Sequence, residues 1–199
     1  KMGVFPIIDH YYEPRFKFDA INQRALVERN LPGIDLNTEK QLKLLDELNY
    51  GSEFMKFTDE QLQISGPQSF RVNNGSFESG DAEFLYSVIR HFKPKNIIEI
   101  GCGSSTKIIR YANQFNATTT GFMSNHVCIE PFEQPWLESF ENVTVLRERL
   151  ENMTDRIVTS LHEGDFLFID SSHMIRPGGD VLEEFLNIIP SLPKGVIVH

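Results

Sequence analysis

A glycine turn between an apolar run and a helical segment constrains this chain more than any other feature. The run Asn96–Ile100 is rich in isoleucine and follows a Lys-Pro-Lys break, which is typical of a buried parallel strand. Gly101 and Gly103 come next, and the amphipathic segment 107–115 is expected to be a helix. Because glycine has no Cβ, the backbone can turn sharply there and come close to a ligand. Together, strand, turn and helix predict a nucleotide-binding unit.

The residues around the turn indicate the class of ligand. A dinucleotide fingerprint has a third glycine, G-x-G-x-x-G, whereas this chain has Thr106 in that place. Glu99 precedes the first glycine, and a carboxylate there suits a cationic ammonium group better than a diphosphate, because like charges repel. Ser104 or Ser105 is expected to cap the helix, whose first N–H groups would face the ligand. The turn therefore favours an amino-acid-bearing nucleoside over NAD.

The run Glu99-Ile100-Gly101-Cys102-Gly103 resembles motif I of the class I S-adenosylmethionine-dependent methyltransferases. Three later stretches are similar to the methyltransferase 24-like family within that superfamily, and they occur in the same order: Phe168–His173, Gly179–Val181 and Pro193–His199. The likeness extends from about Leu31 to the C-terminus. This resemblance implies S-adenosylmethionine as the cofactor and methyl transfer as the activity.

Apolar runs and helical segments alternate after the turn, which indicates the fold class. Strands are expected at 96–100, 126–130, 143–147, 164–170 and 195–199, and further helices at 132–140, 151–161 and 180–189. This alternation predicts an α/β fold with a doubly wound, mostly parallel, Rossmann-like sheet and right-handed crossovers. A complete fold of this class has two more strands, so we expect the sequence to be truncated after the fifth.

The first 78 residues are expected to form an N-terminal extension, and residues 79–199 the S-adenosylmethionine-binding core. Within the extension, residues 1–32 are aromatic and charged without periodicity; they are expected to pack on the domain surface, with a lid or dimer arm as the alternative. Leucines on one face predict a helix at Thr38–Tyr50. The Gly-, Ser- and Asn-rich stretch 66–80 is expected to be a loop that covers the site.

A helix is expected at Asp81–Phe92, where the apolar pattern ends at Lys-Pro. In the methyltransferase fold, the loop before this helix helps to cover the methionine end of the cofactor. The resemblance therefore makes Asp81 a candidate cofactor-binding residue, and a simple helix cap is the alternative.

Glu130 ends the second expected strand, about 27 residues beyond the turn, where a carboxylate can accept hydrogen bonds from both ribose hydroxyls. Phe132 is placed to pack on the adenine ring, with core packing as the alternative. The expected cofactor-binding set is thus Glu99, Gly101, Cys102, Gly103, Ser104, Ser105, Glu130, Phe132 and Asp81.

Asp170 and His173 are the expected catalytic residues, because the fourth strand would deliver a carboxylate and an imidazole to the cofactor side. Methyl transfer is an in-line displacement, and His173 can take the proton of the acceptor at neutral pH. Alternatively, Asp170 helps to bind a divalent metal such as Mg²⁺, as in the metal-dependent methyltransferases that the family resembles. The His-Asp pair that follows the equivalent of His199 in that family is missing here. In a third reading, Asp170 only caps the turn that follows it.

Composition limits the choice of partners. The formal charge of −9, from 19 basic and 28 acidic side chains, argues against nucleic acid as the main partner and favours a small molecule. No apolar run reaches the length of a membrane span, so no membrane partner is expected. Two cysteines make a poor disulfide framework, which predicts a reducing cytoplasm.

The leading functional hypothesis is methylation of a small-molecule or saccharide-type acceptor, most simply on oxygen. A non-catalytic methyltransferase-like scaffold or binding module is the first alternative, and an NAD-dependent oxidoreductase is the second. A homo-oligomer is compatible with each of these hypotheses.

Overall fold

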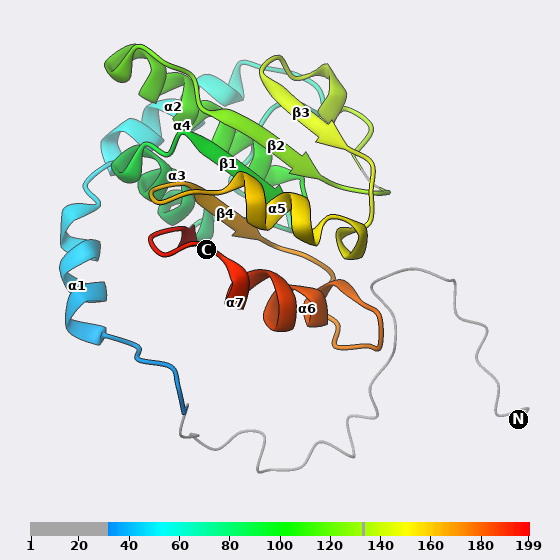
Figure 1. The fold of residues 1–199 in the computed structure, drawn as a ribbon. Helices are drawn as coiled ribbons and strands as arrows, with labels where there is room; N and C mark the ends of the chain where they lie inside the picture. Colours follow the sequence, from blue (N-terminus) through cyan, green and yellow to red (C-terminus); the bar gives the residue numbers. More distant parts are fainter. Residues whose placement is uncertain (1–31, 133) are drawn as a thin grey trace, which may run out of the picture. The chain divides into compact units, whose positions relative to one another are not determined.

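The structure is a computed structural model that describes residues 32–132 and 134–199, in two units. The described part of the first unit, residues 32–47, contains helix α1 (Thr38–Glu47), so the helix expected at Thr38–Tyr50 ends three residues earlier. The second unit runs from Leu48 to His199 and contains all the other elements (Figure 1). The lid, dimer-arm and surface-packing expectations for residues 1–32 fall almost entirely outside the described residues, and the boundary expected between residues 78 and 79 stays a prediction.

A five-stranded sheet forms the centre of the second unit, and all its neighbouring strands are parallel. In chain order the strands are β1 (Asn96–Ile100), β2 (Asn125–Ile129), β3 (Val143–Leu146), β4 (Phe166–Ile169) and β5 (Ile197–Val198). Their spatial order is β3-β2-β1-β4-β5. From β1 the chain adds β2 and then β3 on one side of the sheet. It then crosses to the other side of β1 and adds β4 and β5. This reversal makes the carboxyl ends of β1 and β4 the switch point at which open sheets of this kind bind ligands.

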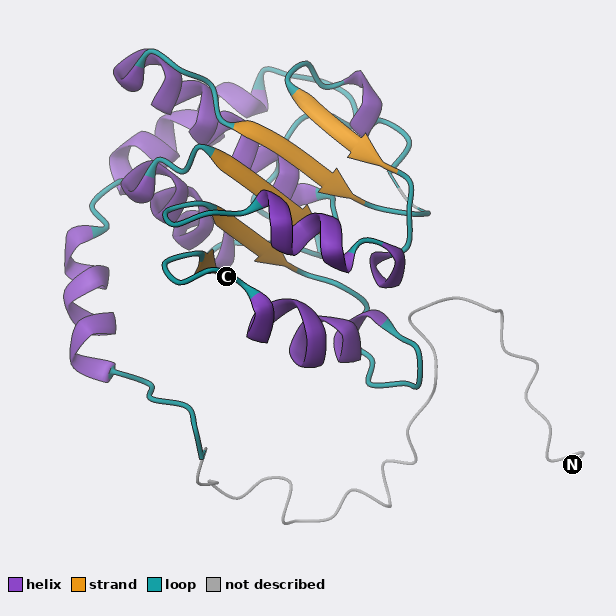
Figure 2. Cartoon of the chain, viewed as in Figure 1, coloured by secondary structure: helices purple, strands orange, loops and turns teal. Residues whose placement is uncertain are grey.

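Helices cover both faces of this sheet, as Figure 2 shows. On one face lie α2 (Gly51–Leu62), α3 (Asp81–Phe92) and α4 (Ser104–Thr120). On the other lie α5 (Thr154–Ser160) and the continuous helical segment of α6 (Asp180–Glu183), the π-helical η5 (Glu184–Ile188) and α7 (Ile189–Ser191). The short 3₁₀ helices η3 (Leu137–Ser139) and η4 (Leu150–Asn152) follow β2 and β3.

The strands supply side chains to both faces by simple alternation. Ile97 and Phe166 pack with α3 and α4, whereas Ile98 and Leu167 pack with α5 and η5. All four are at most 5% exposed. Strands buried on both faces read as continuous apolar runs, which is why β1 and β4 were recognisable in the sequence. The predicted doubly wound α/β fold is confirmed.

Several element predictions were wrong in detail. Helix α2 was not expected, and α4 extends well beyond the predicted 107–115. Only the three residues of η3 are helical in the predicted helix 132–140. The reason is local: Gln134 precedes Pro135 and has a φ of 57°, and a residue before proline is disfavoured in the α region. Among the described residues, no helix is long and apolar enough to span a membrane.

A buried ion pair joins α2 to α3 and α4. Arg90 of α3 is 6% exposed, and its Nε and Nη2 donate to the two carboxylate oxygens of Glu53 at 2.5 and 3.0 Å. The Tyr86 hydroxyl donates to the same carboxylate at 2.6 Å, and Arg90 also donates to Asn116 of α4. The hydrogen bond with Arg90 lowers the pKa of Glu53 more than burial raises it. The Glu53 carboxylate therefore neutralises the positive charge of the buried Arg90 side chain.

We expect Glu53→Ala to lower the free energy of unfolding by about 2–3 kcal/mol, since it leaves the guanidinium of Arg90 buried without its counter-ion. The value is below that for a fully enclosed pair because a quarter of the Glu53 side chain faces solvent. Urea unfolding followed by circular dichroism would measure it. Asp59→Ala, at an exposed position of the same helix, is the matched control. Equal midpoints for the two variants would contradict the prediction.

Candidate functional site

The turn after β1 lies directly against the end of β4. Gly101 has a φ of +75°, and a Cβ at this position would stand 1.9 Å from the carbonyl oxygen of Asp170. The Asp170 amide donates to Ile100 O at 2.8 Å, and the Gly101 amide donates to Ile129 O at 3.2 Å. No side chain can occupy position 101 in this arrangement. At Gly103, by contrast, a Cβ would meet no atom within 4 Å, so the second glycine borders open space.

Helix α4 begins at Ser104, but neither Ser104 nor Ser105 caps it as predicted. Thr106 supplies the cap instead, because its Oγ1 accepts the Gly103 N–H at 3.0 Å. The same hydroxyl donates to Glu99 Oε1 at 3.0 Å, and Ser105 Oγ donates to that oxygen at 2.6 Å. Thr106 thus replaces the third glycine of the dinucleotide pattern with a residue that holds the turn.

Glu99 lies beneath the turn and is fully buried. Its second oxygen, Oε2, lies 2.8 Å from His126 Nε2. The sequence predicted Glu99 as a cofactor-binding residue suited to a cationic ammonium group. In the structure the Glu99 carboxylate contacts side chains, two of them hydroxyls at the start of α4. Glu99 therefore positions the turn from below.

Glu130 joins the turn to the loop after β2. Its Oε2 accepts the Cys102 N–H at 3.3 Å, and its Oε1 accepts the Phe132 N–H at 3.0 Å. The side chain is 5% exposed, and Arg147 donates to the Glu130 carbonyl at 2.9 Å. Phe132 is 57% exposed, so the core-packing alternative for this residue is wrong. The Arg149 guanidinium lies 5.4 Å from the centre of the Phe132 ring.

Asp170 and His173 are neighbours in the loop after β4. His173 Nε2 lies 2.7 Å from Asp170 Oδ1, and the two side chains are 71% and 38% exposed. The turn that follows Asp170 is capped by another residue: Asp180 accepts the Ser172 N–H at 2.9 Å and the Ser172 hydroxyl at 2.5 Å. The reading of Asp170 as a turn cap is therefore wrong. Within the described part of the chain, Asp170 belongs to no group of three metal-ligating side chains, which leaves the Mg²⁺ expectation unsupported.

Asp81 opens helix α3 on the same edge of the sheet. The Gly80 N–H, at the start of this helix, donates to the Glu83 side chain, so Asp81 is not the cap. Burial lowers the pKa of His199, while the charges of Asp81 and Asp170 act in the opposite direction. The His199 ring lies 5.3 Å from that of Phe168 and 5.4 Å from that of Phe84. The charges of Asp81 and Asp170 thus both act on His199, and we call these three residues one electrostatic group. His199 was not among the predicted site residues.

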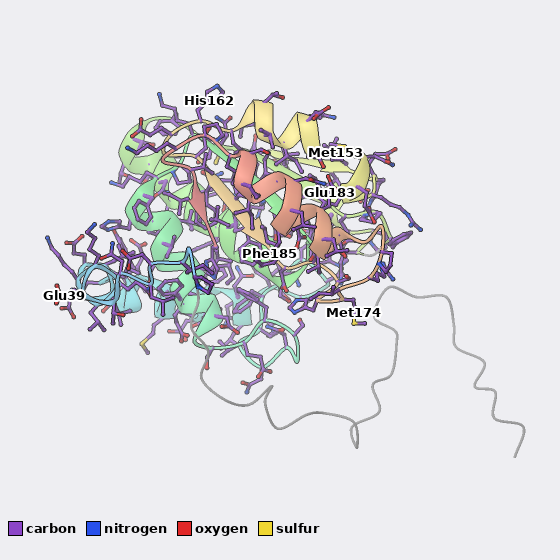
Figure 3. All side chains as sticks on the ribbon, turned by 60° about the horizontal axis from the view of Figure 1, so that its bottom comes forward. Glu39, Met153, His162, Met174, Glu183 and Phe185 are labelled. Atoms are coloured by element: carbon purple, nitrogen blue, oxygen red, sulfur yellow. The ribbon has the colours of Figure 1, made fainter. Side chains whose placement is uncertain are left out.

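Glu184, also not predicted, is a buried acid behind the Asp170 loop. It is 1% exposed, and its Oε1 has no hydrogen-bond partner. Burial raises its pKa to about 7, although a hydrogen bond from Ser171 and the charge of His173 oppose the shift. The two adjacent residues of the helix, labelled in Figure 3, differ from Glu184 in their surroundings. Phe185 is 63% exposed, and Glu183 accepts a hydrogen bond from Thr154. An acid on the apolar stripe of a predicted helix was the sequence signal for it.

We expect Gly101→Ala to cost about 3 kcal/mol or more, because strain at positive φ adds to the clash with the Asp170 backbone. Gly103→Ala is the matched control and should change the free energy of unfolding by about 0.5 kcal/mol at most, since its methyl group enters open space. Thermal melts of the two variants would measure both values. Similar losses at both positions would contradict this account of the turn.

Glu184 should make stability depend on pH. Its folded pKa of about 7 exceeds the ordinary value of 4.5, so the folded protein holds a proton that the unfolded chain releases. Stability from this group is complete below pH 4.5 and is lost as the pH rises to about 7. We expect Glu184→Gln to be more stable than the parent by on the order of 1–3 kcal/mol at pH 8, with a smaller difference at pH 5. Denaturant midpoints at both pH values would measure this, and a gain independent of pH would contradict it.

Comparison with known proteins places the chain in a family. The model of the methyltransferase 24 family, described as a methyltransferase domain, matches residues 98–199, just over half of the chain. An uncharacterized protein of Archaeoglobus fulgidus is 30% identical over 111 residues, which are 53% of this chain and 50% of that protein. The chain therefore spans about half the length of that relative.

Among solved structures, an SAH-bound methyltransferase of Podospora anserina matches with a TM-score of 0.36 and 18% identity, over 72% of this chain and 61% of that one. The family match covers the last three residues of β1, the glycine turn, Glu130 and the Asp170 loop, which build the site described above. The chain belongs to the methyltransferase 24 family of methyltransferase domains.

Proposed function

We propose that this chain binds S-adenosylmethionine over the turn after β1 and transfers its methyl group to a small-molecule acceptor. The observation that carries the proposal is the pairing of open space at Gly103 with the Glu130 carboxylate at the end of the next strand. Membership of the methyltransferase 24 family supports the same ligand. The family, together with Thr106 in place of the third glycine, argues against the NAD-dependent oxidoreductase.

The residues of the turn suit an amino-acid-bearing nucleoside. A Cβ at Gly103 would occupy the space that a ligand needs, and the first N–H groups of the 17-residue helix α4 begin at this point. Glu130 uses one acceptor site on each oxygen for the Cys102 and Phe132 amides. These two bonds fix the carboxylate at the end of β2, and a carboxylate there is an acceptor for ribose hydroxyls.

Two further residues complete the proposed cofactor site. We assign the exposed ring of Phe132 to the adenine, and Asp81, whose charge acts on His199 as that of Asp170 does, to the ammonium group of the methionine end. Ser104 is half-buried at the helix start. Glu99, Cys102 and Ser105 are buried, and we assign them to positioning the turn.

His173 is the proposed general base. The cofactor supplies an electrophilic methyl group, and an acceptor hydroxyl that attacks it must lose a proton. Asp170 Oδ1, at 2.7 Å from His173 Nε2, can orient the imidazole and stabilise its charged form. The base is 71% exposed, so an acceptor can reach it from solvent. We therefore propose O-methylation of a small-molecule or saccharide-type hydroxyl, with no step that requires a metal.

A calorimetric titration with S-adenosylhomocysteine tests the proposal. The parent chain should bind it with a Kd in the micromolar range or below, and Glu130→Ala should weaken binding about 5- to 150-fold, which corresponds to 1–3 kcal/mol for a lost ribose partner. Gly103→Ala should also weaken binding without loss of stability. Glu148→Ala, at an exposed position two residues beyond β3, is the matched control and should bind like the parent.

Circular dichroism melts of the same samples decide what a negative result means. A folded parent chain that does not bind S-adenosylhomocysteine would overturn the proposal and favour the scaffold alternative. Equal affinity of Glu130→Ala and Glu148→Ala would show that the cofactor lies elsewhere.

A further inference from the structure

Three metal-ligating side chains gather at the glycine turn with ligand atoms within 4.8 Å of one another, and a histidine lies against two of them. They are Glu99 of β1, Cys102 of the turn, and His126 and Cys128 of β2, here called the sub-turn cluster. Their exposed fractions are 0%, 8%, 1% and 0%. The cluster includes both cysteines of the chain, and the function proposed above uses the thiol of neither.

The distances within the sub-turn cluster are close to those between the ligands of one small metal ion. Cys128 Sγ lies 3.4 Å from Glu99 Oε2 and 3.5 Å from His126 Nε2, and Glu99 Oε2 lies 2.8 Å from His126 Nε2. Ligand atoms of Glu99, Cys102 and Cys128 all lie within 4.8 Å of one another. Tetrahedral zinc, with bonds of about 2.0–2.3 Å, places its ligand atoms about 3.3–3.8 Å apart. Small side-chain movements would reach that geometry.

The sequence spacing and the surrounding hydrogen bonds support the same ion. Glu99 and Cys102 are three residues apart, and His126 and Cys128 are two apart. Glu99 of β1 is in register with Cys128 of β2, and Cys102 follows in the turn after β1. Thiolate, imidazole and carboxylate are the ligand types that zinc prefers. The other Glu99 oxygen accepts two hydroxyl hydrogen bonds, so it is already oriented from outside the cluster, as the ligands of metal sites commonly are.

A simple ion pair between His126 and Glu99 is the competing account, and it leaves a buried donor unsatisfied. In that account the imidazole is cationic and both of its nitrogens carry protons. His126 Nδ1 is buried and has no hydrogen-bond partner. An unsatisfied donor costs more on a charged group than on a neutral one. Ligation of a metal through Nε2 requires the neutral ring, so the unsatisfied Nδ1–H then carries no positive charge.

We propose that Glu99, Cys102, His126 and Cys128 bind one zinc ion as a structural site. Binding releases the two thiol protons to solvent, and the imidazole binds as the neutral ring, so no oxidant or reductant is needed. The Cys102 amide donates to Glu130, the proposed ribose ligand. An ion on the Cys102 sulfur would therefore fix the turn from below while the cofactor occupies the space above it.

Metal analysis of the intact chain tests this site without any methyl-transfer assay. After purification from zinc-supplemented medium and dialysis, we expect about one zinc per chain. Cobalt substitution should give an intense thiolate-to-cobalt charge-transfer band, which only cysteine ligation produces. We expect Cys128→Ser to lower zinc affinity by at least about 100-fold, since loss of even an indirect partner of a metal ligand costs 10- to 100-fold. His162→Asn, which changes an exposed histidine outside the cluster, should keep the metal.

Three results would overturn the proposal: a folded parent chain without zinc or the cobalt band, an unchanged band in Cys128→Ser, or an intact mass two hydrogens lower, which would identify Cys102 and Cys128 as a disulfide. If Cys128→Ser does not fold, the cobalt spectrum of the parent chain alone decides.

Discussion

The close approach of Gly101 to the backbone of Asp170 is the contact on which the rest of the site depends. It joins the carboxyl ends of β1 and β4, the two strands between which the sheet reverses direction. Ligand-binding loops after these strands can share one site only if the strand ends meet, and a side chain at position 101 would separate them. The Asp170–His173 pair is thereby placed beside the turn, although 68 residues of sequence lie between Gly101 and Asp170.

Below the turn, polar groups are organised by a carboxylate that no solvent reaches. Glu99 accepts Ser105 and Thr106 on one oxygen and contacts His126 with the other, so a single side chain connects β1, the start of α4 and β2. Such a buried network is costly unless its members are satisfied. The hydrogen bonds from Ser105 and Thr106 to Glu99 fix the orientation of α4, and with it the direction in which the first N–H groups of that helix point.

The sequence predicted the doubly wound α/β fold class, the parallel sheet and the location of the turn, because buried strands and helix periodicity leave clear local patterns. It did not predict the partners of individual polar groups. Thr106 rather than Ser105 caps α4, and Asp180 rather than Asp170 caps the Ser172 turn. In each case the competing residues lie close in sequence and have similar chemistry. Glu184 and His199 were missed because their environment arises from packing between segments distant in the chain.

The two glycines of the turn are therefore not equivalent, even though they look alike in the motif. At Gly101 the absent side chain makes room for the protein itself, and at Gly103 it leaves room that no protein atom fills. Folding alone accounts for the first glycine but not for the second. A residue that the fold does not require, at the carboxyl edge of a parallel sheet and beside a carboxylate held by two backbone amides, is best explained by a ligand. The turn therefore carries a structural constraint at Gly101 and, in the function that we propose, a functional one at Gly103.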